Sequence, residues 1–220
     1  MRLGWRCAVV TAVIAILLPA TGDAALRSGA HGASVRALQL SLAWHGFPSG
    51  TVDGRFGPEL VAAVRRFQRS VGLTPDGVAG ASTLAALRAP DVRSPILLAW
   101  PLLARVGDGF GPRGRRFHAG IDLPAPSGTP VLAAAAGTVT WAAPRSGGWG
   151  LLVVLRHADG VRTLYAHLSA IDVRVGDVVS GGTVVGRVGA TGDATGPHLH
   201  FEVRVRGAAV DPLQALVPLP

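Results

Sequence analysis

Two histidines stand two residues apart in the stretch Thr191–Arg206, where turn formers up to Pro197 give way to alternating apolar and polar residues. Side chains on a strand alternate between its two faces. One face would therefore carry His198, His200, Glu202 and Arg204. Two imidazoles fixed on one face can bind a metal ion and move protons beside it. A polar strand face that happens to carry two histidines is the alternative that this stretch alone leaves open.

A second pair of metal-binding residue types lies upstream, in Phe117–Leu123. Gly120 and the nearby Pro124 argue against a helix here, and an extended chain also places His118 and Asp122 on one side. An imidazole and a carboxylate are a normal pair of zinc donors. Taken alone, the pair could equally be a structural histidine beside a surface carboxylate.

A third candidate, His167, falls near the end of a predicted hairpin strand. Its neighbours Leu164, Ala166 and Leu168 alternate with it, as in a strand. Taken alone, it could equally be a satisfied histidine at a strand edge. Together the three sites supply four histidines and one aspartate. Cys7 is the only cysteine, and no serine stands in a nucleophile-elbow pattern, so metal-activated water is the economical chemistry. A catalytic zinc ion takes three protein ligands and keeps a fourth position open, which leaves two imidazoles for proton handling.

Composition describes a folded, basic protein. Of its 220 residues, 49% are hydrophobic and 15% charged, so the chain can build one medium domain or two small ones. The net charge of +8 favours polyanionic partners. Nucleic acid is disfavoured as a partner, because the arginines are scattered and no stacking aromatic residues lie between them.

The first 24 residues have the pattern of a secretory signal peptide. Arg2 and Arg6 precede an apolar run, Cys7–Leu18, and Gly22 and Ala24 suit a cleavage before residue 25. The run is shorter than the roughly 20 apolar residues that span a bilayer. We expect a protein of the cell wall or periplasm, or a secreted one, with no stable membrane insertion after cleavage. An uncleaved membrane anchor is the alternative.

Residues 32–88 predict a helical domain. The apolar spacing predicts helices over Ser34–Trp44, with Ser34 as the N-cap, then over Pro58–Val71 and Ala81–Leu87. The turn pattern of residues 53–57, D-G-R-F-G, returns in part at residues 76–80. His45 is expected at the surface or in a turn. Residues 89–99 are predicted to be a linker, although their Ile96-Leu97-Leu98 run could equally dock against the next domain.

Residues 100–216 predict short strands separated by glycine-rich turns. The clearest signal is a hairpin of Leu151–Arg156 and Val161–Leu168 around Asp159-Gly160. Such a pattern is typical of a compact antiparallel all-β domain. The predicted fold is therefore multidomain: a small all-α three-helix domain followed by a compact antiparallel all-β domain.

The helical half carries the pattern L-Q-x-x-L-x-x-x-G, then D-G-x-F-G-P, then V-x-x-F-Q-x-x-x-G-L-x-x-D-G-x-x-G. This pattern resembles the peptidoglycan-binding domain found beside many wall hydrolases. The resemblance implies a non-catalytic wall anchor. A three-helix spacer that uses the same turn signals is the alternative, since a fold does not fix a function.

The β half carries F-G-x-R, H-x-x-x-D, G-T-P-V-x-A-A-x-x-G-T-V, Y-A-H-L, V-G-D-x-V-x-x-G and T-G-x-x-T-G-P-H-L-H-F-E-V in that order. This order is similar to that of the lysostaphin-type zinc endopeptidases of bacterial cell walls. The resemblance implies one zinc ion per chain, held by His118, Asp122 and His200, with His167 and His198 as the catalytic pair. The spacing by itself does not decide which of His198 and His200 is the ligand.

The same resemblance implies peptidoglycan stem peptides and cross-bridges as the substrate. Some relatives lack these residues and only activate other hydrolases, so a non-catalytic wall-binding regulator is the alternative function. All five residues stand in this sequence. The sequence indicates neither which peptide bond is cut nor the oligomeric state.

Overall fold

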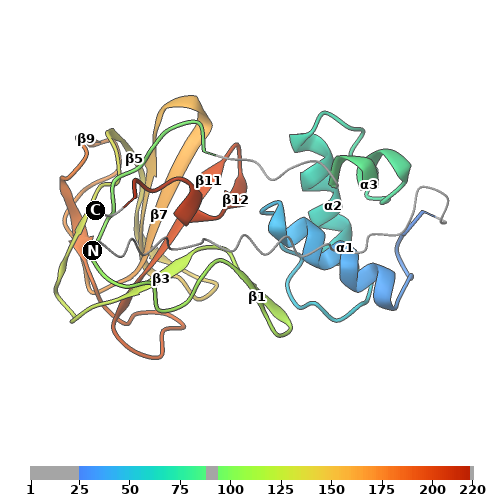
Figure 1. Ribbon diagram of the computed structural model, residues 1–220, viewed down its shortest axis with the longest axis horizontal. Helices are drawn as coiled ribbons and strands as arrows, with labels where there is room; N and C mark the ends of the chain where they lie inside the picture. The colour runs from blue at the N-terminus through green and yellow to red at the C-terminus, as the bar shows by residue number, and fades with distance from the viewer. Residues whose placement is uncertain (1–24, 88–93, 219–220) are drawn as a thin grey trace, which may run out of the picture.

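The computed structural model describes residues 25–87 and 94–218, so the predicted signal peptide and part of the predicted linker lie outside the described residues. Helices occupy the first part of the chain, and the rest forms antiparallel sheets (Figure 1). The predicted fold class is confirmed. Across the described residues, no helix combines the length and the apolar character that crossing a bilayer requires.

The helical unit consists of α1 (Ala33–Trp44), α2 (Pro58–Ser70) and α3 (Ala81–Leu87), which match the predicted ranges closely. Their apolar faces meet in one core. Its largest members are Leu38, Leu42, Leu60, Phe67 and Leu84. The predicted N-cap is wrong. The carbonyl of Gly32 accepts the N–H of Arg36, so α1 begins at Ala33 and Ser34 lies within its first turn.

Two buried glutamines hold the repeated turns of the helical unit. The Oε1 atom of Gln39 on α1 accepts the N–H of Gly54 at 2.8 Å, and its Nε2 atom donates to Asp53 at 3.0 Å. Gln68 on α2 does the same for the second turn, with Gly77 at 3.0 Å and Asp76 at 2.7 Å. The two copies of the Asp-Gly turn therefore share their tertiary contacts as well as their sequence, because each copy binds one glutamine.

The β unit contains the remaining strands. A seven-stranded sheet has the order β12-β11-β7-β6-β5-β9, with β3 also paired to β11. Beside it lie a three-stranded sheet, β4-β10-β8, and the hairpin β1-β2. The bounds of these strands are β1 Gly111–Arg113, β2 Arg116–His118, β3 Ile121–Pro124, β4 Pro130–Leu132, β5 Gly137–Arg145, β6 Gly150–Arg156, β7 Val161–Leu168, β8 Ala170–Ile171, β9 Val178–Val179, β10 Val184–Arg187, β11 His198–Val205 and β12 Ala208–Val210.

All the pairings between these strands are antiparallel, and the predicted hairpin of β6 and β7 is confirmed. A short 3-10 turn, Ala158–Gly160, joins the two strands, and a second one, Pro212–Gln214, follows β12. The sheets enclose an apolar core that includes Tyr165 and Phe201. Leu98 belongs to the same core and exchanges backbone hydrogen bonds with residues 215 and 217, so this run docks on the β unit.

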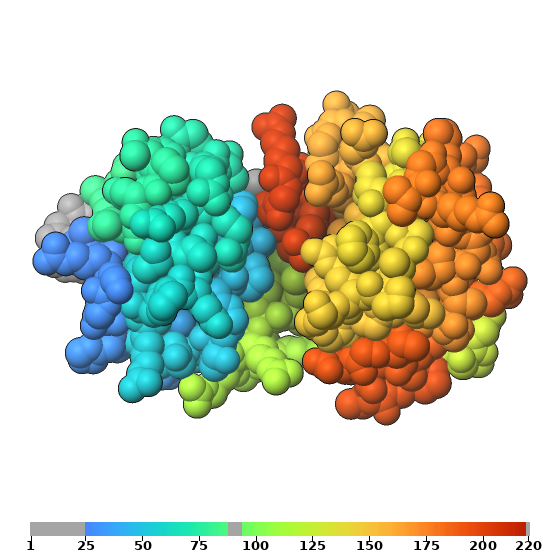
Figure 2. All heavy atoms as spheres, turned by 180° about the vertical axis from the view of Figure 1, so that it is seen from behind, coloured from blue at the N-terminus to red at the C-terminus, as the bar shows by residue number. Residues whose placement is uncertain are grey.

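The two units are packed against each other. Ala208 of β12 belongs to the hydrophobic core of the helical unit. A Cβ atom on Gly46 would lie 1.8 Å from the backbone nitrogen of Ala209, so only glycine permits this approach. The β1-β2 hairpin and the β11-β12 hairpin bridge the two bodies, as the light green and red segments of Figure 2 show.

An aromatic cluster strengthens this interface. Trp44 at the end of α1 packs edge-on against Phe110 and Phe117, with ring centroids 5.5 and 5.3 Å apart. The two phenylalanines also pack on each other at 5.0 Å. Phe117 directly precedes His118, so the helical unit contacts the segment that carries one of the predicted metal ligands.

Candidate metal centre

Strand β11 displays the alternation expected from its sequence. Leu199, Phe201, Val203 and Val205 enter the core, and His198, His200 and Glu202 lie on the other face. β3 pairs with β11 so that Asp122 stands directly opposite His200. Directly opposed residues of an antiparallel pair share a face. The pairing register therefore brings together two of the three predicted ligands.

Gly120 brings the third, His118, into place. A Cβ atom at this position would lie 2.3 Å from the carbonyl oxygen of Phe201 and 3.0 Å from Cε1 of His200. Only glycine lets the link between β2 and β3 pass so close to β11. The predicted ligands His118, Asp122 and His200 then meet, with all their ligand atoms within 4.8 Å of one another.

The individual distances match a small tetrahedral site. His118 Nε2 lies 2.9 Å from His200 Nδ1, and Asp122 Oδ1 lies 3.1 and 2.9 Å from these two nitrogens. Ligands about 2.0–2.1 Å from a tetrahedral zinc ion lie roughly 3.3 Å apart. The three donor atoms are therefore close enough together to bind one zinc ion.

Acceptor groups on the far side of each ring can take the N–H of the tautomer that a metal ion needs. His118 Nδ1 lies 2.7 Å from the carbonyl oxygen of Gly109, which can only accept a hydrogen bond. His200 Nε2 lies 3.3 Å from Oε1 of Glu202. With these nitrogens as donors, His118 Nε2 and His200 Nδ1 would be free to coordinate a metal ion; without one, they lie within hydrogen-bond distance of Asp122 Oδ1 and can donate to it. Arg113 Nη2 lies 2.7 Å from His118 Nδ1 and can only donate, so it competes with Gly109 for this nitrogen.

Arg113 holds the carboxylate of Asp122 in an ion pair. Its guanidinium lies 2.7 Å from Oδ2 of Asp122 and 2.7 Å from Asp108. Burial by itself raises the pKa of Asp122, but hydrogen bonds from His118, His200 and Arg113 outweigh it and hold the pKa well below its usual range. The carboxylate is therefore ionised, as a metal ligand must be.

Glu202, to which the sequence assigned no role, contacts the proposed ligand His200. It is 2% exposed, and Arg204 Nε donates to its Oε2 at 2.7 Å. Burial opposes charge on both Glu202 and His200. Their hydrogen bond and mutual attraction prevail, lowering the pKa of Glu202 and, with Asp122, raising the pKa of His200 to about 9. The sequence feature that could have identified Glu202 is its position on the same polar strand face as His198 and His200.

His167 reaches the site through an irregularity in β7. Tyr165 and Leu168 both enter the core, so strict alternation fails between them. β6 pairs Leu151 with Leu168 but Val153 with Tyr165, which gives β7 one extra residue, a β-bulge. His167 has a φ of 59°, a left-handed conformation that is strained for a residue with a side chain. The bulge thus turns this imidazole to the face that carries His200.

His167 and His198 lie side by side, with ring centroids 4.8 Å apart. Each has Nδ1 2.8 Å from a carbonyl oxygen, of Thr191 and Gly196 respectively. In both rings the hydrogen is therefore on Nδ1 and Nε2 is free, and His198 Nε2 lies 3.7 Å from Asp122 Oδ1. Burial, together with the neighbouring imidazoles, lowers the pKa of His167.

These side chains line an open cavity of about 410 Å³. All five predicted site residues line it, together with residues that the sequence did not single out as a group. The latter include Trp149, Asp193, Thr195 and Pro48, the last from the helical unit. Trp149 forms one wall, with its ring 5.8 Å from that of His200. We refer to this open cavity as the metal groove.

Other histidines have structural partners away from this cavity. His157 bonds to the carbonyl oxygen of Ala136 at 2.8 Å and to Thr163 at 2.7 Å. His45 lies in a turn, one of its two predicted locations, but it is 8% exposed and bonds to the carbonyl oxygen of Leu87, so it is not at the surface. Tyr165 is fully buried, where desolvation raises its pKa to about 12.

Comparisons with known proteins agree with this arrangement. Residues 116–212 match the model of peptidase family M23, and residues 31–87 match that of a peptidoglycan binding domain. The DD-carboxypeptidase/endopeptidase Mpg of Neisseria meningitidis is 53% identical over 105 residues, which are 48% of this chain and 24% of that protein. The chain therefore spans about a quarter of the length of that relative.

Part of the chain is also similar to solved structures. The catalytic domain of lysostaphin from Staphylococcus simulans is 37% identical, with 50% of this chain and 90% of that chain covered and a TM-score of 0.47. Csd3 of Helicobacter pylori is 33% identical, with 56% and 34% covered and a TM-score of 0.50. The chain therefore carries a domain of peptidase family M23, with a peptidoglycan-binding domain ahead of it.

Proposed function

We propose that the protein is a zinc-dependent peptidoglycan endopeptidase that hydrolyses peptide cross-links of the bacterial cell wall, outside the cytoplasm. The observation that carries this proposal is the convergence of His118, Asp122, His167, His198 and His200 on one open groove. Support also comes from relatives named for this activity, such as the peptidoglycan DD-endopeptidase ShyA of Vibrio cholerae, which is 41% identical over 104 residues.

His118, Asp122 and His200 would hold the zinc ion. Two nitrogens and one carboxylate oxygen form the donor set of a catalytic rather than a structural site, because the fourth position stays open. A zinc ion held there supplies Lewis-acid polarisation of a carbonyl oxygen and lowers the pKa of water to about 7. Gly109 and Glu202 would accept the far-side N–H groups of the two rings and so favour the ligating tautomer.

His198 and His167 would handle the attacking water. The carbonyl oxygen of Gly196 fixes the hydrogen of His198 on Nδ1, so Nε2 is the atom that takes a proton from water and later gives it to the leaving amine. Thr191 fixes His167 in the same way. Its free Nε2 is then an acceptor that orients the water, which we favour over stabilisation of the oxyanion.

The helical unit would hold the enzyme on its insoluble substrate, which raises the local concentration of bonds to cut. In this proposal its ligand is the same wall material that the β unit hydrolyses. Zinc binding at one ion per chain, export through the first 24 residues and action in the envelope belong to the same proposal.

Mass analysis of fragments released from purified peptidoglycan tests this function. We expect cleaved cross-links from the zinc-loaded protein, loss of release with a chelator, and recovery with added zinc. His118→Ala should retain the fold, by circular dichroism, and release no fragments. Full release by that variant would overturn the assignment. Wall binding without any release from the zinc-loaded protein would favour the non-catalytic regulator.

A further inference from the structure

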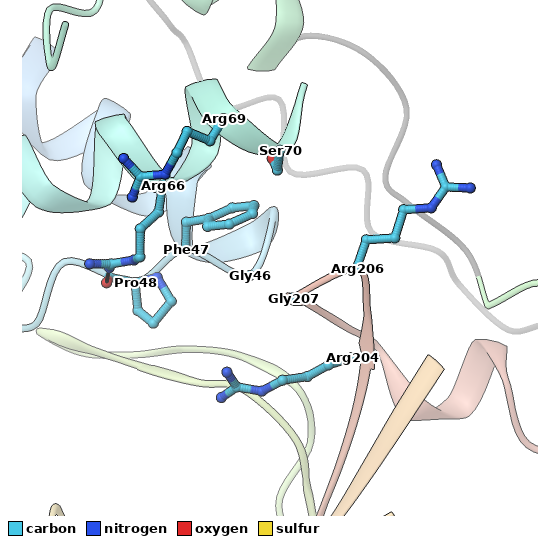
Figure 3. Close-up of a pocket in the computed structure, with 9 residues that line it drawn as sticks. All are labelled: Gly46, Phe47, Pro48, Arg66, Arg69, Ser70, Arg204, Arg206 and Gly207. Carbon is cyan, nitrogen blue, oxygen red and sulfur yellow. Dashed lines mark hydrogen bonds between the residues drawn. The ribbon is translucent and has the colours of Figure 1, made fainter. Parts of the chain in front are cut away.

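A second cavity, of about 540 Å³, lies between the two units and away from the metal ligands (Figure 3). On the helical side it is lined by Pro48 and by Arg66 and Arg69 of α2. On the β side it is lined by Arg204 of β11 and Arg206 of the turn to β12. Its volume falls within the 300–1,000 Å³ that is common for ligand sites.

The charge of this cavity is almost uncompensated. Arg204 is paired with Glu202 at 2.7 Å. Among the described residues, no acidic side chain lies within 4.0 Å of the guanidinium groups of Arg66, Arg69 or Arg206. Arg66 donates to the carbonyl oxygen of Pro48 at 3.0 Å, and both burial and nearby Arg69 lower its pKa. A bound anion would reduce the electrostatic repulsion between these guanidinium groups.

The arginine cavity adjoins the metal groove, because Pro48 and Arg204 line both. The side chains of Arg66, Arg69 and Arg204 extend toward the side on which Pro48 lies, whereas Arg206 extends the other way (Figure 3). A ligand chain that leaves the metal groove past Pro48 would therefore meet three guanidinium groups in turn.

We propose that this interdomain cavity binds the free carboxylates of a peptidoglycan stem peptide next to the cross-link being cut. This inference rests on the proposed function, which supplies the wall as substrate. Guanidinium groups bind carboxylates in bidentate pairs, with geometric specificity. The contiguity with the metal groove favours a peptide of the same wall strand over a separate phosphodiester polymer.

The test measures binding rather than hydrolysis. The ligand is an uncross-linked disaccharide tripeptide, which offers no cross-link to cut, in its free-carboxylate and fully amidated forms. Calorimetric titration of the full chain should give tighter binding of the free-carboxylate form. Arg66→Gln/Arg69→Gln should weaken that binding by about tenfold or more. Both residues are exposed, so we expect unchanged thermal unfolding.

The matched control is Arg36→Gln/Arg174→Gln, which removes the same charge from exposed positions that line neither cavity. We expect this control to change binding less than twofold. Equal affinity for the two ligand forms, or equal weakening by the control, would overturn the proposal. So would binding of a glycerol phosphate oligomer that depends on the two arginines when tripeptide binding does not.

The result of this binding test can be distinguished from the result of the test of the proposed function. If His118→Ala abolishes hydrolysis while tripeptide binding persists and depends on the arginines, both proposals stand. If hydrolysis depends on His118 but tripeptide binding is indifferent to the arginines, only the carboxylate site fails. If no cross-link is cut by the zinc-loaded protein, the function fails, and the binding result still decides whether the cavity takes carboxylates.

Discussion

The helical and β units both bury polar side chains, but they complete the hydrogen bonds of those side chains differently. Gln39 and Gln68 use both their donor and their acceptor atoms in hydrogen bonds to the turns of their own unit. His118, His198 and His200 each have one nitrogen bonded outward and one directed at a shared centre. A buried polar group with all its partners stabilises a fold, whereas converging groups with a free lone pair are arranged for chemistry.

The largest effect should come from a histidine with a free nitrogen. His198→Ala removes the proposed proton carrier, so we expect kcat to fall by about 10²- to 10⁴-fold. Because His198 is not a proposed ligand, zinc content measured by mass spectrometry should stay at one ion per chain. His31→Ala, at an exposed position, is the control. Loss of zinc together with activity would place His198 among the ligands instead.

A smaller effect is expected from the residue that orients a ligand. Glu202→Gln keeps the shape of the side chain but weakens its hold on His200 Nε2, so zinc affinity should fall by about 10- to 100-fold. Competition with a chromophoric chelator measures this affinity. Glu59→Gln at an exposed position should leave it unchanged. Wild-type affinity in the Glu202 variant would mean that Glu202 serves packing alone.

The corresponding change in the helical unit should alter stability instead of chemistry. Gln68→Leu leaves the N–H of Gly77 and the side chain of Asp76 without this partner, at a cost of about 2–4 kcal/mol in the free energy of unfolding of this unit. Urea titration measures this loss, and Gln214→Leu, at an exposed position, is the control. Hydrolysis of soluble fragments per folded molecule should not change, and a large drop would contradict the contrast between the two units.

The smallest effect concerns His157, a β-unit histidine whose two nitrogens are both bonded. Burial lowers its pKa in the folded protein. The unfolded chain then binds more protons below about pH 6.5, so the His157 contribution to stability is present above that pH and is lost as the pH falls.

His157→Gln should therefore flatten the rise of unfolding free energy with pH between about 5 and 7. Urea titration at several pH values measures the slope, with His31→Gln as the control. An identical slope in the wild type and the His157 variant would show that His157 does not titrate between the folded and unfolded states in this range. The histidines of the metal centre contribute equally to all three proteins and cancel in the comparison.

Much of this structure could be predicted from the local periodicity of the sequence. The helices, the β6-β7 hairpin and the two faces of β11 follow from patterns of 3.6 and 2 residues, and the order of the histidine motifs indicated the family. The orientation of the His167 side chain was harder to predict, because strict alternation places it with Tyr165 on the core face. Only the bulge reverses it, and a bulge depends on the pairing of β7 with β6 rather than on the residues nearby.

Contacts between distant residues escaped prediction for the same reason. The role of Gln39 requires knowing that residues 53 and 54 fold back onto α1. The burial of His45 depends on Leu87, and the arginine cavity exists only where α2 faces the β11-β12 hairpin. None of these has a sequence period, so each needs the tertiary structure.

Ala208 is a residue of the peptidase sheet that completes the core of the helical unit. Separating the two units would expose apolar surface on both sides, so the joint opposes hinge motion. Under the proposed function, the wall-holding part and the cutting part would therefore move together as one body instead of the second swinging on a tether.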